Sequence, residues 1–109
     1  MTGNARGYSV SNLEGMIEFA KDGIVSKTIV DEPRSKVVLF CMAAGQSLSE
    51  HTASVPATIH VIRGEGTITL DGNKTRGTPG TFVFMPEKQP HALKAEKDMV
   101  FLLHLMKKN

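Results

Sequence analysis

Short apolar segments rich in β-branched residues, separated by glycine and proline turns, constrain the fold of this 109-residue chain most strongly. The segments expected as strands are 24–30, 36–43, 57–63, 66–70, 81–85, 91–95 and 99–106. Many short strands at regular spacing are typical of a β-sandwich or barrel. Asp71-Gly72, between residues 67–70 and 74–76, predicts a tight hairpin. We therefore expect an all-β domain over residues 24–109.

The first 23 residues differ from this pattern and are expected to form an N-terminal extension. Leu13, Met16, Ile17 and Ala20 recur at nearly helical spacing, and Asn12 could cap a short helix there. A glycine at position 15 weakens this expectation, because glycine is a poor helix former. The extension is thus expected to be extended, with a short helical segment.

Composition restricts the classes of partner and the compartment. The length fits one domain, and 40% hydrophobic with 22% charged residues is the balance of an ordinary soluble protein. The formal net charge is only +2 and the basic residues are scattered, so we expect neither nucleic acid nor a membrane as a partner. The single cysteine, Cys41, lies in an apolar run and is expected to be a buried structural thiol. With no signal-peptide pattern, a cytoplasmic location is expected.

Two histidines follow glycine turns at fixed spacings. Gly80 leads into a short apolar strand that ends before Pro86, and His91 follows five residues later. Upstream, five residues separate Gly45 from His51. This arrangement resembles the two motifs of the cupin superfamily, Gly-x5-His-x-His-x3–4-Glu-x6-Gly and Gly-x5-Pro-x-Gly-x2-His-x3-Asn. The resemblance implies a double-stranded β-helix, or jelly-roll barrel, in which the motif histidines bind a metal ion inside.

The chain departs from these motifs at positions that carry chemistry. Ala53 and Ala57 stand where the first motif has its second histidine and its glutamate, although Gly64 matches the closing glycine. In the second motif Lys88 replaces the glycine and Ala95 the asparagine. The closest resemblance is to small stand-alone cupins whose first motif reads His-Thr-Ala. The resemblance therefore supplies only two ligands, whereas tight binding of a transition metal takes three or four donors.

Further donors could come from the two remaining histidines. His104 alternates with Leu102 and Met106 on one face of a terminal strand, and it would be a third ligand if that face points inward. Otherwise it is a buried neutral histidine or a residue facing a dimer partner. Alternation from an inward Ala57 places His60 outside unless a bulge reverses the face, so His60 is the weaker candidate. The residues expected to line the ligand cavity are Met42, Ile59, Met85, Leu102 and Met106.

Three functions remain open at this point. The first is a metal-binding barrel holding zinc, iron, manganese, nickel or copper, with or without catalysis. The second is a metal-free isomerase in which a histidine acts as general acid or base. The third is a metal-free module that binds or senses a small molecule. The resemblance also implies a homodimer.

Overall fold

The computed structural model describes residues 7–108, so part of the predicted 1–23 extension lies outside the described residues. A single turn of 3₁₀ helix, Glu14–Met16, precedes the strands. The strands are β1 (Ile24–Glu32), β2 (Ser35–Met42), β3 (Ser47–His51), β4 (Ala57–Arg63), β5 (Gly66–Leu70), β6 (Asn73–Gly77), β7 (Phe82–Met85), β8 (His91–Ala95) and β9 (Met99–Met106).

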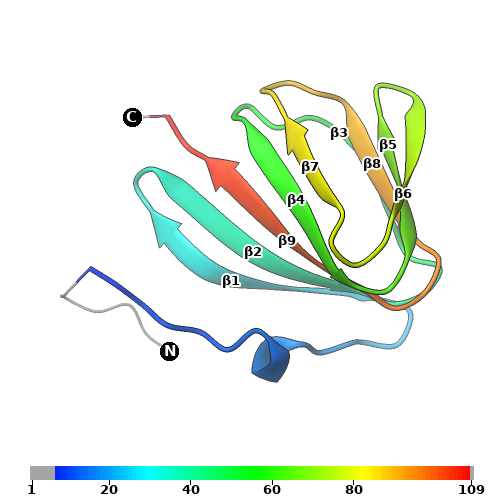
Figure 1. Cartoon of the computed structure of the whole chain (residues 1–109), viewed down its shortest axis with the longest axis horizontal. Coiled ribbons are helices and arrows are strands. Elements are labelled where there is room, and N and C mark those ends of the chain that lie inside the picture. Colours follow the sequence, from blue (N-terminus) through cyan, green and yellow to red (C-terminus); the bar gives the residue numbers. More distant parts are fainter. Residues whose placement is uncertain (1–6, 109) are drawn as a thin grey trace.

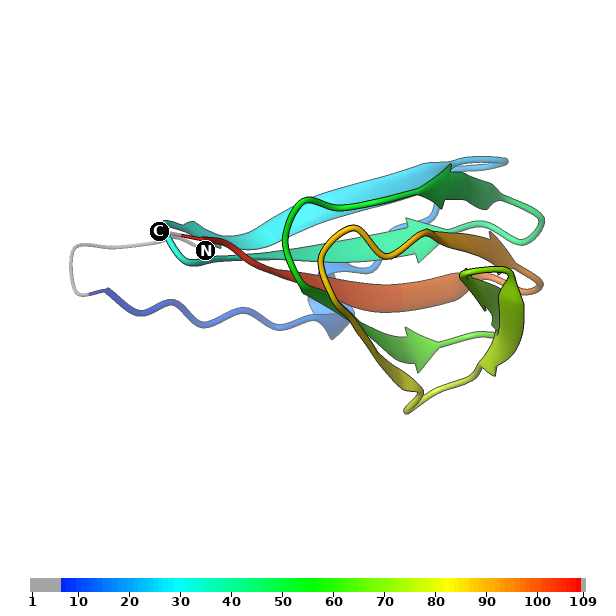
Figure 2. The same cartoon turned by 90° about the horizontal axis from the view of Figure 1, so that it is seen from above.

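These strands form two sheets that face each other across one core (Figures 1 and 2). The five-stranded sheet has the order β1-β2-β9-β4-β7, and the four-stranded sheet has the order β3-β8-β5-β6. All registered pairs are antiparallel. The predicted all-β jelly-roll barrel is therefore confirmed. All seven predicted strands are present, and β6 is the second strand of the predicted hairpin, whereas β3 was not predicted.

Alternating residues from both sheets fill the space between them. On β9 the odd-numbered residues point inward: Met99 and Phe101 belong to the core cluster, and Leu103 and Leu105 pack against it. Their partners on β4 point the same way, because directly opposed residues of an antiparallel pair lie on the same face. The remaining buried members of the core cluster are Met42, Ala57, Ile59, Val61, Ile68, Val83, Met85, Leu93 and Ala95.

Two turns explain particular residues of the sequence. Asp71 and Gly72 both have positive φ, 52° and 82°, as the predicted two-residue hairpin between β5 and β6 requires. Gly64, with φ of 81°, joins β4 to β5 beside the β8–β9 turn. A Cβ atom at Gly64 would lie 2.0 Å from the carbonyl oxygen of Asp98. Only glycine fits there, which gives a steric reason for the glycine that closes the first motif.

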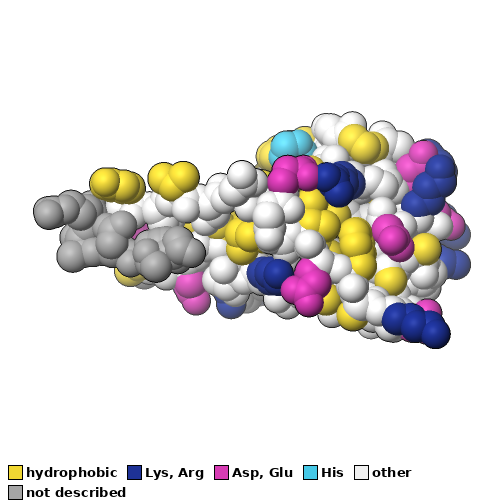
Figure 3. Space-filling view, turned by 90° about the horizontal axis from the view of Figure 1, so that it is seen from below, with side chains coloured by type: hydrophobic (Ala, Val, Ile, Leu, Met, Phe, Trp, Pro, Cys, Tyr) yellow, Lys and Arg dark blue, Asp and Glu magenta, His cyan; other side chains and the backbone are white. Residues whose placement is uncertain are grey.

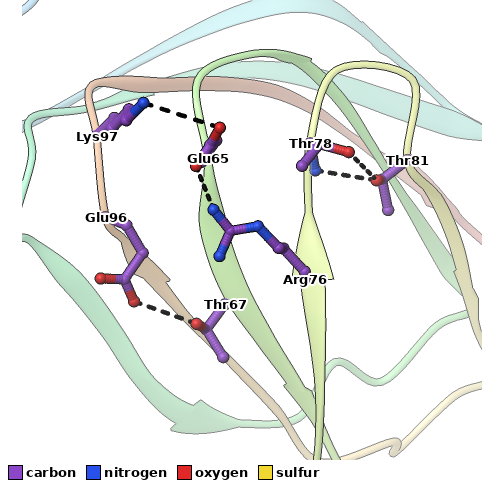
Figure 4. A network of polar contacts seen from close by, with 7 residues as sticks. All are labelled: Glu65, Thr67, Arg76, Thr78, Thr81, Glu96 and Lys97. Carbon is purple, nitrogen blue, oxygen red and sulfur yellow. Dashed lines mark hydrogen bonds and ion pairs between the residues drawn. The ribbon is translucent and has the colours of Figure 1, made fainter.

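Ion pairs and hydroxyl contacts join the loops at the same end of the barrel (Figure 4). Glu65 binds Arg76 of β6 and lies 3.9 Å from the Lys97 ammonium. Thr67 Oγ1 donates to a carboxylate oxygen of Glu96 at 3.2 Å. These contacts tie β5, β6 and the β8–β9 turn together, at the end of the barrel opposite the β3–β4 loop.

The N-terminal segment covers part of the outer face of the five-stranded sheet (Figure 1). Met16 and Ile17 pack on a second apolar cluster formed by Leu39, Cys41 and Val100. The predicted helix is reduced to the Glu14–Met16 turn, in keeping with the glycine at position 15. Ion pairs hold the segment in place, one between Glu14 and Arg63 and one of 2.9 Å between Glu18 and Lys27. None of the helices among residues 7–108 is long and apolar enough to cross a membrane.

Candidate functional site

His51 and His91 meet at the end of the four-stranded sheet, where β3 pairs with β8. They are directly opposed in the register, and the centroids of their imidazole rings are 4.1 Å apart with an interplanar angle of 60°. His91 is 5% exposed and is the one buried residue of polar type among those described. His51, at the last position of β3, is exposed. The pair therefore extends from the buried interior of the barrel, where His91 lies, to the open rim, where His51 lies.

A β-bulge brings His51 to this position. Leu48 pairs with Leu93 and His51 pairs with His91, so β3 has two intervening residues where β8 has one. In a regular strand Leu48 and His51 would point to opposite faces, because side chains alternate. The extra residue reverses the face, and His51 joins Leu48 on the inner side while Glu50 remains exposed.

In both rings Nδ1 is the atom that contacts the backbone, either of the same strand or of the loop before it. His51 Nδ1 lies 2.8 Å from the carbonyl oxygen of Ser49, and His91 Nδ1 lies 2.8 Å from that of Gln89. A carbonyl oxygen can only accept, so each Nδ1 carries the hydrogen when the ring is neutral. The Nε2 atom of each ring then has a free lone pair. Histidines that bind metals commonly donate their second ring nitrogen to a backbone carbonyl in this way.

The donor set fits a metal ion held by two imidazoles and no further protein ligand. Among residues 7–108 no group of three or more histidine, cysteine, aspartate or glutamate side chains could hold one ion. Ala53 and Ala57 offer no donor atom at the positions where the family motif has ligands. An ion bound here would complete its coordination with water or with a small ligand.

The space beneath the histidine pair is small and apolar. A cavity of about 40 Å³ lies there, with room for about one or two water molecules. Its lining consists of Phe40, Leu48, His51, Ile59, His91, Leu93, Phe101 and Leu103. The rings of Phe40 and Phe101 stack with centroids 5.0 Å apart and an interplanar angle of 3°. This stacked pair fills the barrel below the histidines, so a larger ligand would have to bind at the rim.

The condition under which His104 would be a third ligand is not met, because the face of β9 that carries it points out of the barrel. His104 pairs with Val37 and Thr58, while Leu103 and Leu105 point into the core. Leu102 packs against the outer cluster, so Leu102, His104 and Met106 share the outer face of the sheet. Alternation along β9 was correctly predicted, but the sequence of one strand does not show which of its two faces is buried when both are apolar. His104 therefore does not join the histidine pair, and Leu102 and Met106 do not line the cavity.

The other candidate residues also have defined positions. His60 is exposed on the outer face, as alternation predicted, with its ring 6.2 Å from that of Phe82. Ile59 lines the cavity, whereas Met42 and Met85 are buried core residues that do not. Cys41 is buried and free, as predicted, and belongs to the outer cluster. Phe40 and Phe101 were not singled out from the sequence, since their contact depends on the register of β2 with β9.

A jelly-roll barrel with a histidine on each of two adjacent strands is typical of one class of small β-barrel proteins. Comparison of the sequence with family models identifies that class. The family model described as "Cupin domain" matches residues 38–105, and the chain belongs to this family. No functionally curated protein matches the sequence.

Solved structures agree with this assignment. The chain is similar to a conserved protein of unknown function from Streptococcus pyogenes, with a TM-score of 0.84, 26% identity and coverage of 99% of this chain and 92% of that one. It is similar to a cupin superfamily protein from Desulfitobacterium hafniense, with a TM-score of 0.83, 24% identity and coverage of 88% of each chain. A Cupin 2 conserved barrel domain protein from Leptotrichia buccalis has a TM-score of 0.82 and 33% identity. The alignment covers 89% of this chain and 47% of that protein, about half its length.

Proposed function

We propose that this barrel binds a divalent transition metal ion through Nε2 of His51 and Nε2 of His91. The observation that carries the proposal is the matching pair of Nδ1–carbonyl contacts, which leaves two imidazole lone pairs at one place. Imidazole suits zinc, copper, iron and nickel better than it suits manganese, which prefers oxygen ligands. The open coordination positions would face the rim and the small cavity, where a bound ion can polarise a ligand or activate water.

The roles of the protein groups follow from their positions. His91 is buried and would be the inner anchor, while the exposed His51 would close the site from the rim. The carbonyl oxygens of Ser49 and Gln89 fix the tautomer and the orientation of the rings. The apolar lining keeps water contact low beneath the ion. Whether a reaction follows depends on the ligand that fills the open positions.

Metal analysis of purified, untagged protein tests this proposal. We expect about one equivalent of bound metal per chain in equilibrium dialysis against zinc, copper or nickel salts, because two protein ligands hold an ion too weakly to keep it once free ion is removed. His91→Ala and His51→Ala should each abolish binding of the ion. His104→Ala is the matched control, because its ring lies on the outer face, and it should bind the metal. No binding by the wild-type protein, or equal binding by His91→Ala, would contradict the proposal.

A second candidate is a metal-free module that binds a small molecule. It is favoured by the lack of a third metal-binding side chain among residues 7–108. In that case the two Nε2 atoms accept hydrogen bonds from donors on a ligand at the rim. The metal-free acid–base isomerase has less support, because both histidines are oriented by carbonyl oxygens and not by a carboxylate. Protein that retains no metal yet shifts its histidine resonances with a small molecule would favour the module.

A further inference from the structure

The outer face of the four-stranded sheet carries a hollow of about 410 Å³. This volume is in the range of small-molecule sites, and it is roughly ten times the space beneath the histidine pair. β5 and β6 lie at the end of the molecule away from the start of the N-terminal segment, and basic side chains gather among acidic ones at that end (Figures 1 and 3). Six of the side chains that line the hollow are hydroxyls or lysines, namely Ser47, Ser49, Thr67, Thr69, Lys74 and Lys94.

The strand registers bring two lysines to either side of β5. Ile68 belongs to the core, so Thr67 and Thr69 beside it point outward. Thr67 pairs with Lys94 of β8. Thr69 pairs with Lys74 of β6. The two lysine backbones are therefore about 10 Å apart across the sheet, because neighbouring strands are about 4.8 Å apart, and their four-carbon stems allow both ammonium groups to reach over the threonines.

Most polar groups of the hollow have no partner within the described part of the chain. Neither Lys74 nor Lys94 forms an ion pair among residues 7–108. The hydroxyls of Ser47, Ser49 and Thr69 make no side-chain hydrogen bond with any of these residues either. These ammonium and hydroxyl groups are thus available to a ligand.

The charges of the hollow favour an anion. Two lysines and one carboxylate, that of Glu96, give the lining a net formal charge of +1. The Glu96 carboxylate already accepts a hydrogen bond from Thr67 Oγ1 (Figure 4). Ammonium groups bind phosphate as point charges, and hydroxyls can donate to its oxygen atoms. Of the described residues that line the hollow none is aromatic, so the site offers no ring on which a flat ligand could stack.

We propose that this hollow binds a small phosphomonoester whose remaining part carries hydroxyl groups and no aromatic ring. The phosphate lies over β5 between the two lysine ammonium groups, and the serines of β3 bind the hydroxyls of the ligand. Such a ligand bridges β3 to β5 across β8. Because β3 is an edge strand with β8 as its only neighbour in the sheet, the bridge also holds β3 in place.

Titration of isotope-labelled, metal-free protein with glycerol 3-phosphate tests the proposal. The titration is run at constant ionic strength and about pH 8, where free imidazole is neutral and does not attract an anion. We expect saturable shifts of backbone amides in β3 and β5, with a Kd on the order of 1 mM. Glycerol and inorganic phosphate should each bind at least about tenfold more weakly, because each lacks one part of the ligand.

Two lysine variants test the charges. Lys74→Met and Lys94→Met should each raise the Kd about tenfold, since each removes one charge-assisted contact. Lys21→Met is the matched control, because it removes the same charge from the N-terminal segment, and its Kd should be unchanged. All three lysines are exposed, so each variant is expected to fold, which circular dichroism would verify. An unchanged Kd in both hollow variants would overturn the proposal.

Amide hydrogen exchange tests the bridge to β3 separately. With glycerol 3-phosphate at ten times its Kd, exchange in β3 should slow by about tenfold if the ligand binds only while β3 is closed. Exchange in β9 is the control and should not change. Unchanged exchange in β3 at saturation would overturn the bridging role. The absence of a saturable shift, shifts centred on His51 and His91, or equal affinity for inorganic phosphate would each overturn the site itself. Because the protein is metal-free throughout, these outcomes are independent of the metal proposal.

Discussion

His51 lies directly opposite His91 across the β3–β8 pair because β3 contains one residue more than its partner between Leu48 and His51. The bulge, and not simple alternation, places the ring on the inner side. The distance of 4.1 Å between ring centroids is therefore sensitive to the number of residues in β3. Substitution tests the rings themselves, but a change in strand length tests how they are brought together.

Deleting one residue from β3 and inserting one into it should have opposite effects on metal binding by the histidine pair. Deleting Glu50 removes the extra residue and leaves a regular strand in which Leu48 and the histidine still share one face, so the pair should persist. Inserting one glycine between Glu50 and His51, with the bulge at residues 49 and 50 kept, moves the histidine one position past His91 in the register and should turn its ring outward. We expect the deletion to retain metal and the insertion to lose it, each measured by metal analysis on folded protein. The reverse order would contradict the role assigned to the bulge.

Phe101→Ala should create a cavity beneath the histidine pair. Phe101 is 1% exposed and stacks on Phe40, and truncation of a buried phenylalanine costs about 3–5 kcal/mol of unfolding free energy. Denaturant unfolding measures this loss. The enlarged apolar space should also admit benzene, detected as a rise in the melting temperature of the variant only. Phe84→Ala is the control of equal size, and because its ring is 60% exposed it should be only slightly destabilised.

Lys88→Gly should leave stability unchanged or raise it by up to about 1.5 kcal/mol. Lys88 has φ of 66°, a left-handed conformation that costs a residue with a Cβ atom about 1–2 kcal/mol. Glycine avoids this cost but loses about 0.5–1 kcal/mol through the greater freedom of the unfolded chain. The family motif has glycine at this position, which agrees with the geometry. Glu87 does not have a positive φ, so Glu87→Gly brings no relief of backbone strain to offset the greater freedom of the unfolded chain. It should lower the free energy of unfolding, measured by denaturant unfolding of both variants.

Lys107→Met should raise the pKa of Asp31. Lys107 Nζ donates to Asp31 Oδ1 at 2.6 Å, and this hydrogen bond, with the ammonium charge, holds the pKa of the carboxyl below its ordinary value. A lowered folded-state pKa stabilises the protein above the unfolded pKa, and the contribution is lost as pH falls through the folded value. Removing the partner should therefore lower the free energy of unfolding at neutral pH and leave it unchanged in strong acid.

Carboxyl carbon resonances measured during an acid titration would report the shift. Lys108→Met removes a different ion pair, the 2.8 Å contact with Glu87, and should leave Asp31 unchanged. An unchanged Asp31 titration in Lys107→Met would show that the pair does not form in solution.

The sequence predicted the barrel well because glycine and proline turns mark the ends of its strands. The motif spacing also singled out His51 and His91, whose rings the fold brings together, and their role as ligands stays a prediction. The sequence did not predict β3, whose Ser-Leu-Ser-Glu-His sequence lacks sustained alternation and contains a bulge. It left the face of His104 open because β9 is apolar on both sides, one side packing on the core and the other partly under the N-terminal segment. The position of a bulge and the buried face of a strand both depend on contacts between strands that are distant in the sequence.

The position of β3 at the edge of its sheet has a consequence for the lifetime of the histidine pair. β3 is held by one neighbour, β8, through three registered residue pairs, and most of its side chains are exposed. Edge elements with few buried contacts open locally at a lower free energy than the core. Amide hydrogen exchange should therefore be faster in β3 than in β9. Each such opening would separate His51 from a His91 that stays in place, so the rate of local opening sets an upper limit on how long anything held by both rings can stay bound.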